Sequence, residues 1–281
     1  WLEDVDCLND IEVLNGDIRD PHYCKHITKN IDIVFHLAAL IAIPYSYVAP
    51  DSYVSTNVNG TLNICQASLD NNVSRVIHTS TSEVYGTAQY VPIDENHPQK
   101  PINPYGASKL MVEKVLKDYS NAYGLNSICL RYFNACGADP DGERAERQEP
   151  EMQLIPLILQ AASGNYDTED GTCIRDYIHV DDLAKAHVMA LDYMSKGGES
   201  QILNCGYGRG FTVQEVIDMV KEKSGKDFPA EQVERRAGDP DALMADNTKI
   251  KKVLGWKPDH EDLGVIVQSA LDWEAAWQAK K

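Results

Sequence analysis

"SRVIHTSTS" (residues 74–82), followed by "NPYGASKLMVEKV" (residues 103–115), decides the fold of this chain. The first stretch is a short apolar run that ends in hydroxyl side chains, which predicts a buried strand. The second has apolar residues at helical spacing and Pro104 just before its first turn, which predicts an amphipathic helix. A strand followed by a helix is the repeating unit of a parallel sheet.

Tyr105 and Lys109 stand four residues apart near the start of this helix. Since four residues make about one turn, the two side chains share one face. A Tyr-x-x-x-Lys pair arises easily by chance, so its meaning depends on the strand before it. Ligands of parallel sheets bind beyond the carboxyl ends of the strands. At that end we expect Thr79, Ser80, Thr81, Ser82 and Glu83.

The rest of the chain alternates apolar runs with helical patterns. In the first half we expect strands at 11–17, 31–40 and 126–135 and a helix at 52–71. In the second half we expect a loop at 137–152, a helix at 152–163, a strand and a helix within 173–194 with a cap near Asp181 or Asp182, and helices at 212–224, 248–254 and 263–279. Apolar strands separated by helices indicate a doubly wound α/β fold, with a parallel sheet covered on both faces.

Composition narrows the functional classes. The formal net charge of −17 argues against binding to nucleic acid or to an anionic membrane, so an anionic ligand needs a local cluster of positive charge. We expect neither a membrane span nor a signal peptide, because the sequence shows no long apolar run and no leader pattern. The seven cysteines lack short paired spacings, which favours reduced thiols in a cytoplasmic protein and no metal site.

The chain combines a buried strand, a hydroxyl-rich strand end and a Tyr105–Lys109 pair on the helix that follows. In this combination it resembles extended short-chain dehydrogenases/reductases that act on nucleotide sugars. From about Tyr105 onward it is similar to UDP-glucose 4-epimerases, through "YGASKLMVEKVLKDY", "LRYFNACGADPDGE", "LIPLILQAA", "DGTCIRDYIHVDDLAKAH" and "RRAGDPDALMAD". The earlier half resembles sugar-nucleotide 4,6-dehydratases, through "FHLAALIAIPYSYVAPDSYVSTNVNGT" and "HTSTSEVYG".

This resemblance implies a Rossmann-type sheet that binds NAD and a smaller, interleaved α/β region that binds the sugar nucleotide. It assigns residues 1–133 and 174–198 to the NAD-binding domain, and residues 134–173 and 199–281 to the sugar-nucleotide domain. The family begins with a strand, a glycine-rich turn and a helix that hold the dinucleotide pyrophosphate. That first βαβ unit is missing from this sequence, so we expect the chain to be the interior of a longer protein. The family also usually carries more residues between "ASG" and "DGT" than this chain does.

The resemblance also implies catalytic roles. Tyr105 is the expected acid/base on the sugar 4-hydroxyl, and Lys109 is expected to hold the nicotinamide ribose and to lower the pKa of Tyr105. Thr81 is expected to hydrogen-bond the same hydroxyl, although a strand-end threonine can instead cap its own backbone. The chemistry agrees, because removing a hydroxyl proton while hydride leaves the carbon needs a base poised near neutrality.

Binding residues follow from the same resemblance. For the cofactor, Asp17 and Ile18 are expected at the adenine, Ala38 and Ala39 along the pocket, Asn57 as its support, Thr79 at the strand end and Tyr132 near the nicotinamide. For the nucleotide diphosphate and its ribose, the expected residues are Asn134, Arg175, Arg236 and Asp239. Arginine suits this task because a planar guanidinium binds phosphate oxygens in pairs, and surface ion pairing is the alternative for each arginine. His179 is expected to be structural.

The function predicted from these motifs is that of a UDP-hexose 4-epimerase. One alternative is a nucleotide-sugar 4,6-dehydratase, in which Glu83 removes the C5 proton. Many dehydratases place Asp before that Glu, and Ser82 is a poorer acid. The other alternative is a non-catalytic sugar-nucleotide-binding subunit. The family further implies a homodimer that pairs the 52–71 helix and the Tyr105 helix across a two-fold axis.

Overall fold

The structure, a computed structural model, describes residues 7–141, 162–163, 166, 168–230, 232–233 and 240–279. Its main sheet has four parallel strands in the order β1-β2-β3-β8. These are β1 (Ile33–His36), β2 (Arg75–Thr81), β3 (Asn126–Tyr132) and β8 (Gln201–Cys205). The doubly wound α/β fold predicted from the sequence is confirmed.

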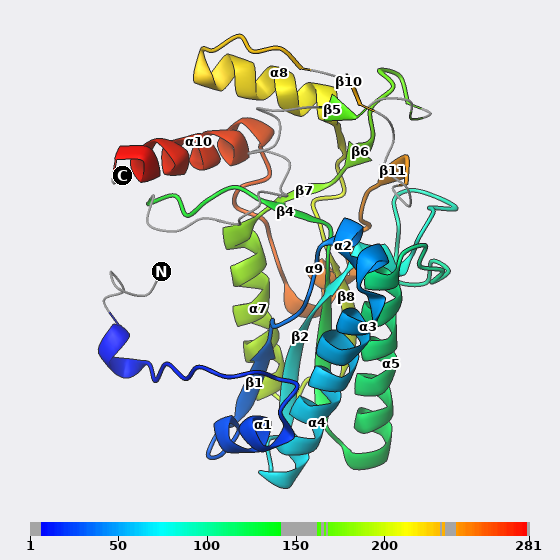
Figure 1. The fold of residues 1–281 in the computed structure, drawn as a ribbon, viewed down its shortest axis with the longest axis vertical. Coiled ribbons are helices and arrows are strands. Elements are labelled where there is room, and N and C mark those ends of the chain that lie inside the picture. The colour runs from blue at the N-terminus through cyan, green and yellow to red at the C-terminus, as the bar shows by residue number, and fades with distance from the viewer. Residues whose placement is uncertain are drawn as a thin grey trace.

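Helices cover both faces of this sheet (Figure 1). On one face lie α4 (Gly60–Asp70) and α5 (Pro104–Tyr123), and on the other lie α7 (Val180–Ser195) and α9 (Thr248–Leu254). Before α4 the chain forms α2 (Ile43–Val48), α3 (Pro50–Tyr53) and the π-helical turn η2 (Val54–Asn59). Since α3, η2 and α4 follow one another directly, the helix predicted at 52–71 is confirmed. The helix α1 (Pro21–Ile27) packs on α4.

Short strands and two helices form a second layer beyond the carboxyl ends of the main strands (Figure 1). The strands pair as β4 (Asn134–Cys136) with β7 (Tyr177–His179), β6 (Ile174–Arg175) with β9 (Phe211–Thr212) and β11 (Ala242–Leu243), and β5 (Ala162–Ser163) with β10 (Gln232–Val233). The helices α8 (Val213–Ser224) and α10 (Leu263–Ala279) pack on each other. The helices predicted at 212–224, 248–254 and 263–279 are therefore confirmed.

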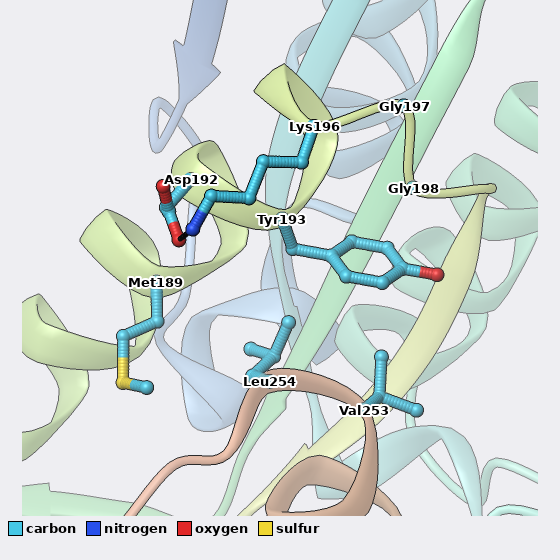
Figure 2. Close-up of a pocket in the computed structure, with 8 residues that line it drawn as sticks. All are labelled: Met189, Asp192, Tyr193, Lys196, Gly197, Gly198, Val253 and Leu254. Atoms are coloured by element: carbon cyan, nitrogen blue, oxygen red, sulfur yellow. Dashed lines mark hydrogen bonds and ion pairs between the residues drawn. The ribbon is translucent and has the colours of Figure 1, made fainter.

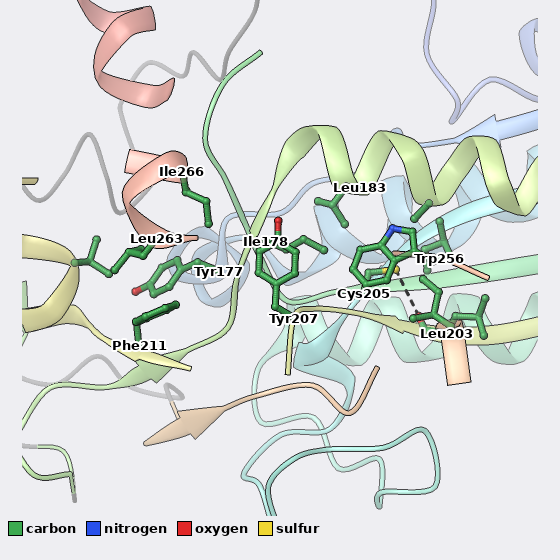
Figure 3. Packing of buried hydrophobic residues seen from close by; sticks show 14 of the residues in the cluster. Tyr177, Ile178, Leu183, Leu203, Cys205, Tyr207, Phe211, Trp256, Leu263 and Ile266 are labelled. Atoms are coloured by element: carbon green, nitrogen blue, oxygen red, sulfur yellow. Dashed lines mark hydrogen bonds between the residues drawn. The ribbon is translucent and has the colours of Figure 1, made fainter. Parts of the chain in front are cut away.

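One hydrophobic cluster joins the main sheet to this second layer (Figure 3). Leu203 of the sheet and Ile266 of α10 are both fully buried in it. Trp256 is also fully buried, and its ring stacks on Tyr207 with centroids 6.4 Å apart. Its indole nitrogen donates to the carbonyl of Asp182 at 3.1 Å, so its polar edge is satisfied. Because the core is continuous, the second layer is held in place over the ends of the strands.

Two predictions in the first half need correction. Residues 11–17 are extended but form no strand, and no described segment pairs with them. Ile11, Val13 and Leu14 are 42%, 62% and 43% exposed there, since a strand needs a neighbour to pair its backbone and cover its apolar side chains. The strand predicted at 31–40 is real but covers only β1, because pairing with β2 extends only from Ile33 to His36.

The second half also departs from the predictions. Residues 152–161 of a predicted helix lie outside the described residues, and its last two positions form β5. The cap of α7 is His179, whose ring nitrogen accepts from the backbone N–H of Asp181 at 3.2 Å, so neither Asp181 nor Asp182 takes that place. Within the described ranges, no helix is both long enough and apolar enough to cross a membrane.

Candidate active site

The end of β2 and the first turns of α5 meet at the carboxyl edge of the main sheet. Asn103 caps α5, and Pro104 supplies a residue preset for the first turn. This start brings Tyr105 and Lys109 onto the strand end, where they are 8% and 2% exposed. The Lys109 Nζ donates to the carbonyl of Thr79 at 2.8 Å. The structure thus brings together the tyrosine, the lysine and the hydroxyl-rich strand end.

Lys109 is held as a buried ammonium with spare donors. Burial lowers its pKa to about 8, opposed by charges nearby that include Glu113. An ammonium has three N–H donors. Among the described residues only the Thr79 carbonyl accepts from it, so further acceptors on a bound ligand can be satisfied.

Burial dominates the electrostatics of Tyr105. It raises the pKa of Tyr105 above the usual range, the nearby Thr81 side chain opposes that rise, and the charge of Glu83 adds to it. The pKa of Tyr105 is thus raised in this structure, and its lowering by Lys109 stays a prediction for the protein with its cofactor bound.

Thr81 caps its own backbone, which is one of the two roles considered for it, and the role toward the sugar 4-hydroxyl stays a prediction. Its Oγ1 accepts from the backbone N–H of Glu83 at 3.2 Å and so caps the short helix η3 (Ser82–Val84). The same side chain lies near the Tyr105 hydroxyl and opposes the rise in its pKa. Glu83 in turn accepts a 2.7 Å hydrogen bond at Oε2 from the Asn103 amide. The two hydroxyls are thus neighbours at the mouth of the site.

Residues expected at the cofactor line the same edge. The Asn57 side chain is 1% exposed and bonds both backbone groups of Leu40, at 2.8 and 3.0 Å, so it fixes the loop after β1. Ala38 and Ala39 lie on that loop, the first exposed and the second half-buried. Their short side chains leave room beside the strand ends.

Asp17 and Ile18 lie further along, at the β1 edge. Asp17 is exposed and ion-paired with Arg19 at 2.5 Å, which holds its pKa at about 2. The Ile18 side chain packs over Gly60, where a Cβ would lie 2.6 Å from its Cδ1. The glycine at the start of α4 therefore sets how closely this segment approaches.

Tyr132 stands beside Thr81 in the strand register and faces α7. The Nδ1 of His187 donates to the carbonyl of Leu183 at 3.0 Å, which leaves Nε2 to accept from the Tyr132 hydroxyl at 3.2 Å. Burial raises the pKa of Tyr132, and the neighbouring Thr79 side chain opposes that rise. The contact with His187 thus fixes the Tyr132 ring at the strand ends.

The expected sugar-nucleotide residues are only partly placed. Asn134 begins β4 two residues after Tyr132, and its backbone N–H donates to the carbonyl of Asp176 at 2.9 Å. Arg175 is 5% exposed, with Nη1 donating to the Ile174 carbonyl at 2.8 Å. Arg236 and Asp239 lie outside the described residues.

A buried ionic network below the site was not predicted. The Arg131 guanidinium contacts both carboxylate oxygens of Glu113, at 2.9 and 2.6 Å, and the hydroxyl of Tyr85 at 2.7 Å. Ser80 adds a 2.5 Å bond to the same carboxylate. Two signals could have revealed it, namely an arginine inside an apolar strand and a glutamate one turn after Lys109.

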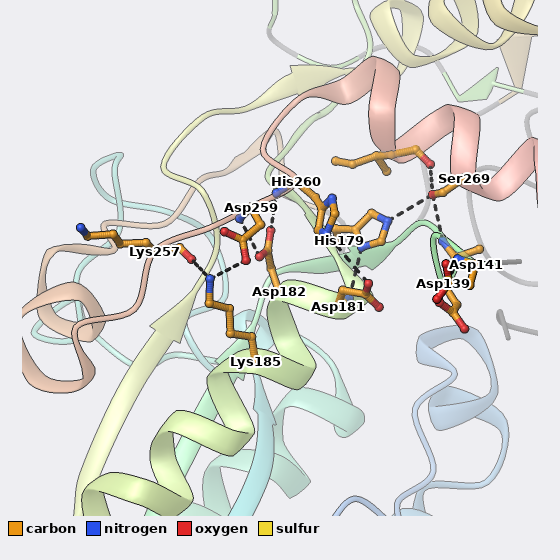
Figure 4. Close-up of polar contacts among 12 residues, drawn as sticks. Asp139, Asp141, His179, Asp181, Asp182, Lys185, Lys257, Asp259, His260 and Ser269 are labelled. Carbon is orange, nitrogen blue, oxygen red and sulfur yellow. Dashed lines mark hydrogen bonds and ion pairs between the residues drawn. The ribbon is translucent and has the colours of Figure 1, made fainter. Parts of the chain in front are cut away.

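His179, Asp181 and His260 form a second polar cluster, at the start of α7 (Figure 4). One possible ligand atom from each residue lies within 4.8 Å of those of the other two. Among the described residues, this is the group whose spacing could suit a metal ion. Both ring nitrogens of His179 are already used, by the cap of α7 and by a 3.2 Å contact with Ser269. His260 stacks on His179 with centroids 4.5 Å apart. These contacts join α7 to α10, in agreement with a structural His179.

A surface recess of about 380 Å³ lies elsewhere, where α7 ends (Figure 2). Helices of this sheet run opposite to its strands, so the recess is at the amino ends of the strands and away from Tyr105. Its lining includes the exposed ion pair between Lys196 and Asp192. The residues that line it are Met189, Asp192, Tyr193, Lys196, Gly197, Gly198, Val253 and Leu254.

Comparison with known proteins identifies relatives along nearly the whole chain. A family model described as GDP-mannose 4,6 dehydratase matches residues 2–263. A UDP-glucose 4-epimerase of Azospirillum brasilense is 44% identical over 276 residues, which cover 94% of this chain and 79% of the relative.

Solved structures agree. The crystal structure of UDP-glucose 4-epimerase from Brucella ovis in complex with NAD has a TM-score of 0.88 at 39% identity, covering 92% of this chain and 84% of that one. A double mutant of the dTDP-glucose 4,6-dehydratase from Streptomyces venezuelae, with NAD bound, has a TM-score of 0.78 at 27% identity, covering 95% and 81%. The chain therefore belongs to the extended short-chain dehydrogenase/reductase family of nucleotide-sugar epimerases and dehydratases.

Proposed function

We propose that this protein is a UDP-hexose 4-epimerase that oxidises its sugar transiently at C4 with bound NAD. The observation that carries the proposal is the buried Tyr105 at the hydroxyl-rich end of β2, beside Thr81 and one helical turn from the buried Lys109. The relatives support the substrate, because the Azospirillum brasilense protein named UDP-glucose 4-epimerase is 44% identical over 276 residues.

In this proposal the chain's own groups move the proton. Tyr105 takes the proton of the sugar 4-hydroxyl and later returns it. Thr81 hydrogen-bonds the same sugar oxygen and keeps it oriented toward Tyr105. Burial alone raises the pKa of Tyr105, so the active base needs a further positive charge beside it. Lys109 supplies part of that charge once its spare donors turn to a ligand.

The residues at the strand ends fit a nicotinamide dinucleotide. Lys109 offers unused N–H donors for ribose hydroxyls, and Asn57 fixes the loop that carries Ala38 and Ala39. Thr79 and Tyr132 would hold the nicotinamide end, while Asp17 and Ile18 would face the adenosine. NAD, when bound, supplies the acceptor and donor of hydride for C4. The protein's part is to hold both partners and to manage the hydroxyl proton.

For the substrate we propose Asn134, Arg175, Arg236 and Asp239 as the nucleotide-binding residues. The net charge of the chain is −17, so an anionic diphosphate needs arginine at its pocket. A sugar nucleotide lying beyond the carboxyl ends of the strands would sit between the main sheet and the second layer. We propose to draw the domain boundary after β8, since residues 201–205 pair with β3 in the main sheet.

A 4,6-dehydratase is the second candidate, because Glu83 stands at the site. Its carboxylate is bonded to Asn103 at 2.7 Å, and Asn103 in turn caps α5. Ser82, in the position that needs an acid for water loss, is 3% exposed and carries only a hydroxyl. These two features favour the epimerase over the dehydratase.

We also propose a cytoplasmic homodimer. All seven cysteines are free thiols, which suits a reducing compartment. The helices expected to pair expose apolar side chains, with Val54 45% and Met111 46% exposed. An apolar helical face of this kind is what a two-fold interface buries.

Product analysis tests the proposed function. Full-length protein given UDP-glucose and NAD should form UDP-galactose, with no change of mass. A product lighter by one water would establish the dehydratase, and no product despite tight sugar-nucleotide binding would establish a binding subunit. In an epimerase Glu83→Gln should change turnover only modestly, because no C5 proton is removed, whereas in a dehydratase it should abolish water loss.

A further inference from the structure

A ring of hydrogen bonds encloses the amino end of α5. Thr81 Oγ1 accepts from the Glu83 N–H at 3.2 Å, and Glu83 Oε2 accepts from Asn103 Nδ2 at 2.7 Å. Asn103 Oδ1 accepts from the Gly106 N–H at 2.7 Å. Tyr105 follows two residues after Asn103, and the nearby Thr81 side chain opposes the rise in its pKa, so the proximity of these two side chains completes the ring. It therefore connects the two hydroxyls proposed to bind the sugar 4-hydroxyl through the backbone and side chain of Glu83.

Close packing leaves this ring little freedom. A Cβ at Gly106 would lie 2.5 Å from the carbonyl oxygen of Glu83, so the first turn of α5 rests directly on that backbone. Asn103 and Thr81 are 4% and 7% exposed. A displacement of Glu83 is therefore passed to the start of α5 and not absorbed by solvent.

We propose that Glu83 is a positioning residue, which holds Asn103 and thereby fixes the contact between Tyr105 and Thr81. The catalytic meaning of this rests on the proposed function, which assigns those two hydroxyls to the substrate. Asn103 is suited to the link because its amide offers both an acceptor for the helix and a donor for a carboxylate. Aspartate would cap the helix equally well but has no donor for Glu83.

The charge of Glu83 has a separate effect that serves as a readout. It adds to the rise in the pKa of Tyr105, for which burial is the larger cause. Removing the charge but keeping the acceptor, as in Glu83→Gln, lowers that pKa. The acid limb of the pH–rate profile then moves to lower pH.

The test is a cycle of three variants at pH 8: Asn103→Asp, Glu83→Gln and both together. Asn103→Asp keeps the helix cap but sets two carboxylates against each other, and should lower kcat by about 10- to 100-fold through misplacement of Tyr105. The double variant restores a donor and an acceptor with their places exchanged, so it should regain most of that loss. Asn96→Asp is the control for the same change of side chain, since the exposed Asn96 amide also donates to a carboxylate, that of Asp94 at 3.4 Å, away from α5.

A readout without turnover separates this inference from the proposed function. Tyrosine labelled with ¹³C at Cζ reports the hydrogen bond of Tyr105, whose signal is identified by its loss in Tyr105→Phe. In Asn103→Asp the signal should move toward its position in Thr81→Ala, and in the double variant it should return. An unmoved signal in Asn103→Asp, or a double variant no closer to wild type, overturns the positioning role. The expected movements in a protein without epimerase turnover would support the positioning role and refute the proposed function.

Discussion

The buried pair of Arg131 and Glu113 provides a severe test of the packing below the site. The two side chains are 0% and 3% exposed, and two hydrogen bonds of 2.9 and 2.6 Å join them. Arg131→Met leaves the Glu113 carboxylate in the core with the Ser80 hydroxyl as its remaining described partner. Removing one partner of a buried pair costs about 3–5 kcal/mol, because the other charge stays without compensation.

Equilibrium unfolding in urea at fixed protein concentration measures this cost. Arg131→Met should lower the free energy of unfolding by about 3–5 kcal/mol, whereas Arg131→Met combined with Glu113→Gln should recover part of it, since neither member of the pair is then charged. Lys185→Met is the control, because its ion pair with Asp259 is 36% and 61% exposed and should contribute at most about 1 kcal/mol. A loss below about 1 kcal/mol in Arg131→Met would refute the reasoning.

Three other predictions follow from the site and its surroundings. Tyr105→Phe should reduce turnover by roughly 10²- to 10⁴-fold with substrate binding largely kept, and near-normal turnover would end its assignment as the base. Burial lowers the pKa of Lys109 from 10.5 to about 8, so the folded state binds this proton less tightly than the unfolded state. The stability of the cofactor-free protein should therefore rise between about pH 8 and pH 10.5, and Lys109→Met should remove that rise relative to wild type in thermal unfolding. Light scattering at micromolar concentration should give the mass of two chains, and the mass of one chain would count against the homodimer.

Local patterns were sufficient to predict the main sheet and the placement of Tyr105 and Lys109. The strand at 74–82 and the helix after Asn103 each carry their own signal, and helical spacing puts Tyr105 and Lys109 on one face. Their encounter with Thr81 follows from chain order alone, since a parallel sheet gathers the carboxyl ends of its strands at one edge.

Features that depend on distant contacts could not be predicted in this way. Residues 11–17 have the composition of a strand, but strand formation also requires a neighbour, which no local pattern specifies. His179 caps α7 in place of the adjacent aspartates because Tyr207 binds Asp182 at 2.6 Å and draws it into the core. The burial that raises the pKa of Tyr105 also depends on distant contacts, so its size could not be predicted from the local motif.

Isotopic labelling of the sugar most directly tests the central claim, that Tyr105 and its neighbours support reversible oxidation at C4. UDP-glucose deuterated at C4 and C5 is incubated with full-length protein and NAD in ordinary water, and the product is analysed by NMR and mass spectrometry. The account predicts UDP-galactose that keeps the deuterium at both C4 and C5. Deuterium found at C6 of a product that has lost water, or replacement of the C5 deuterium by solvent hydrogen, would contradict it.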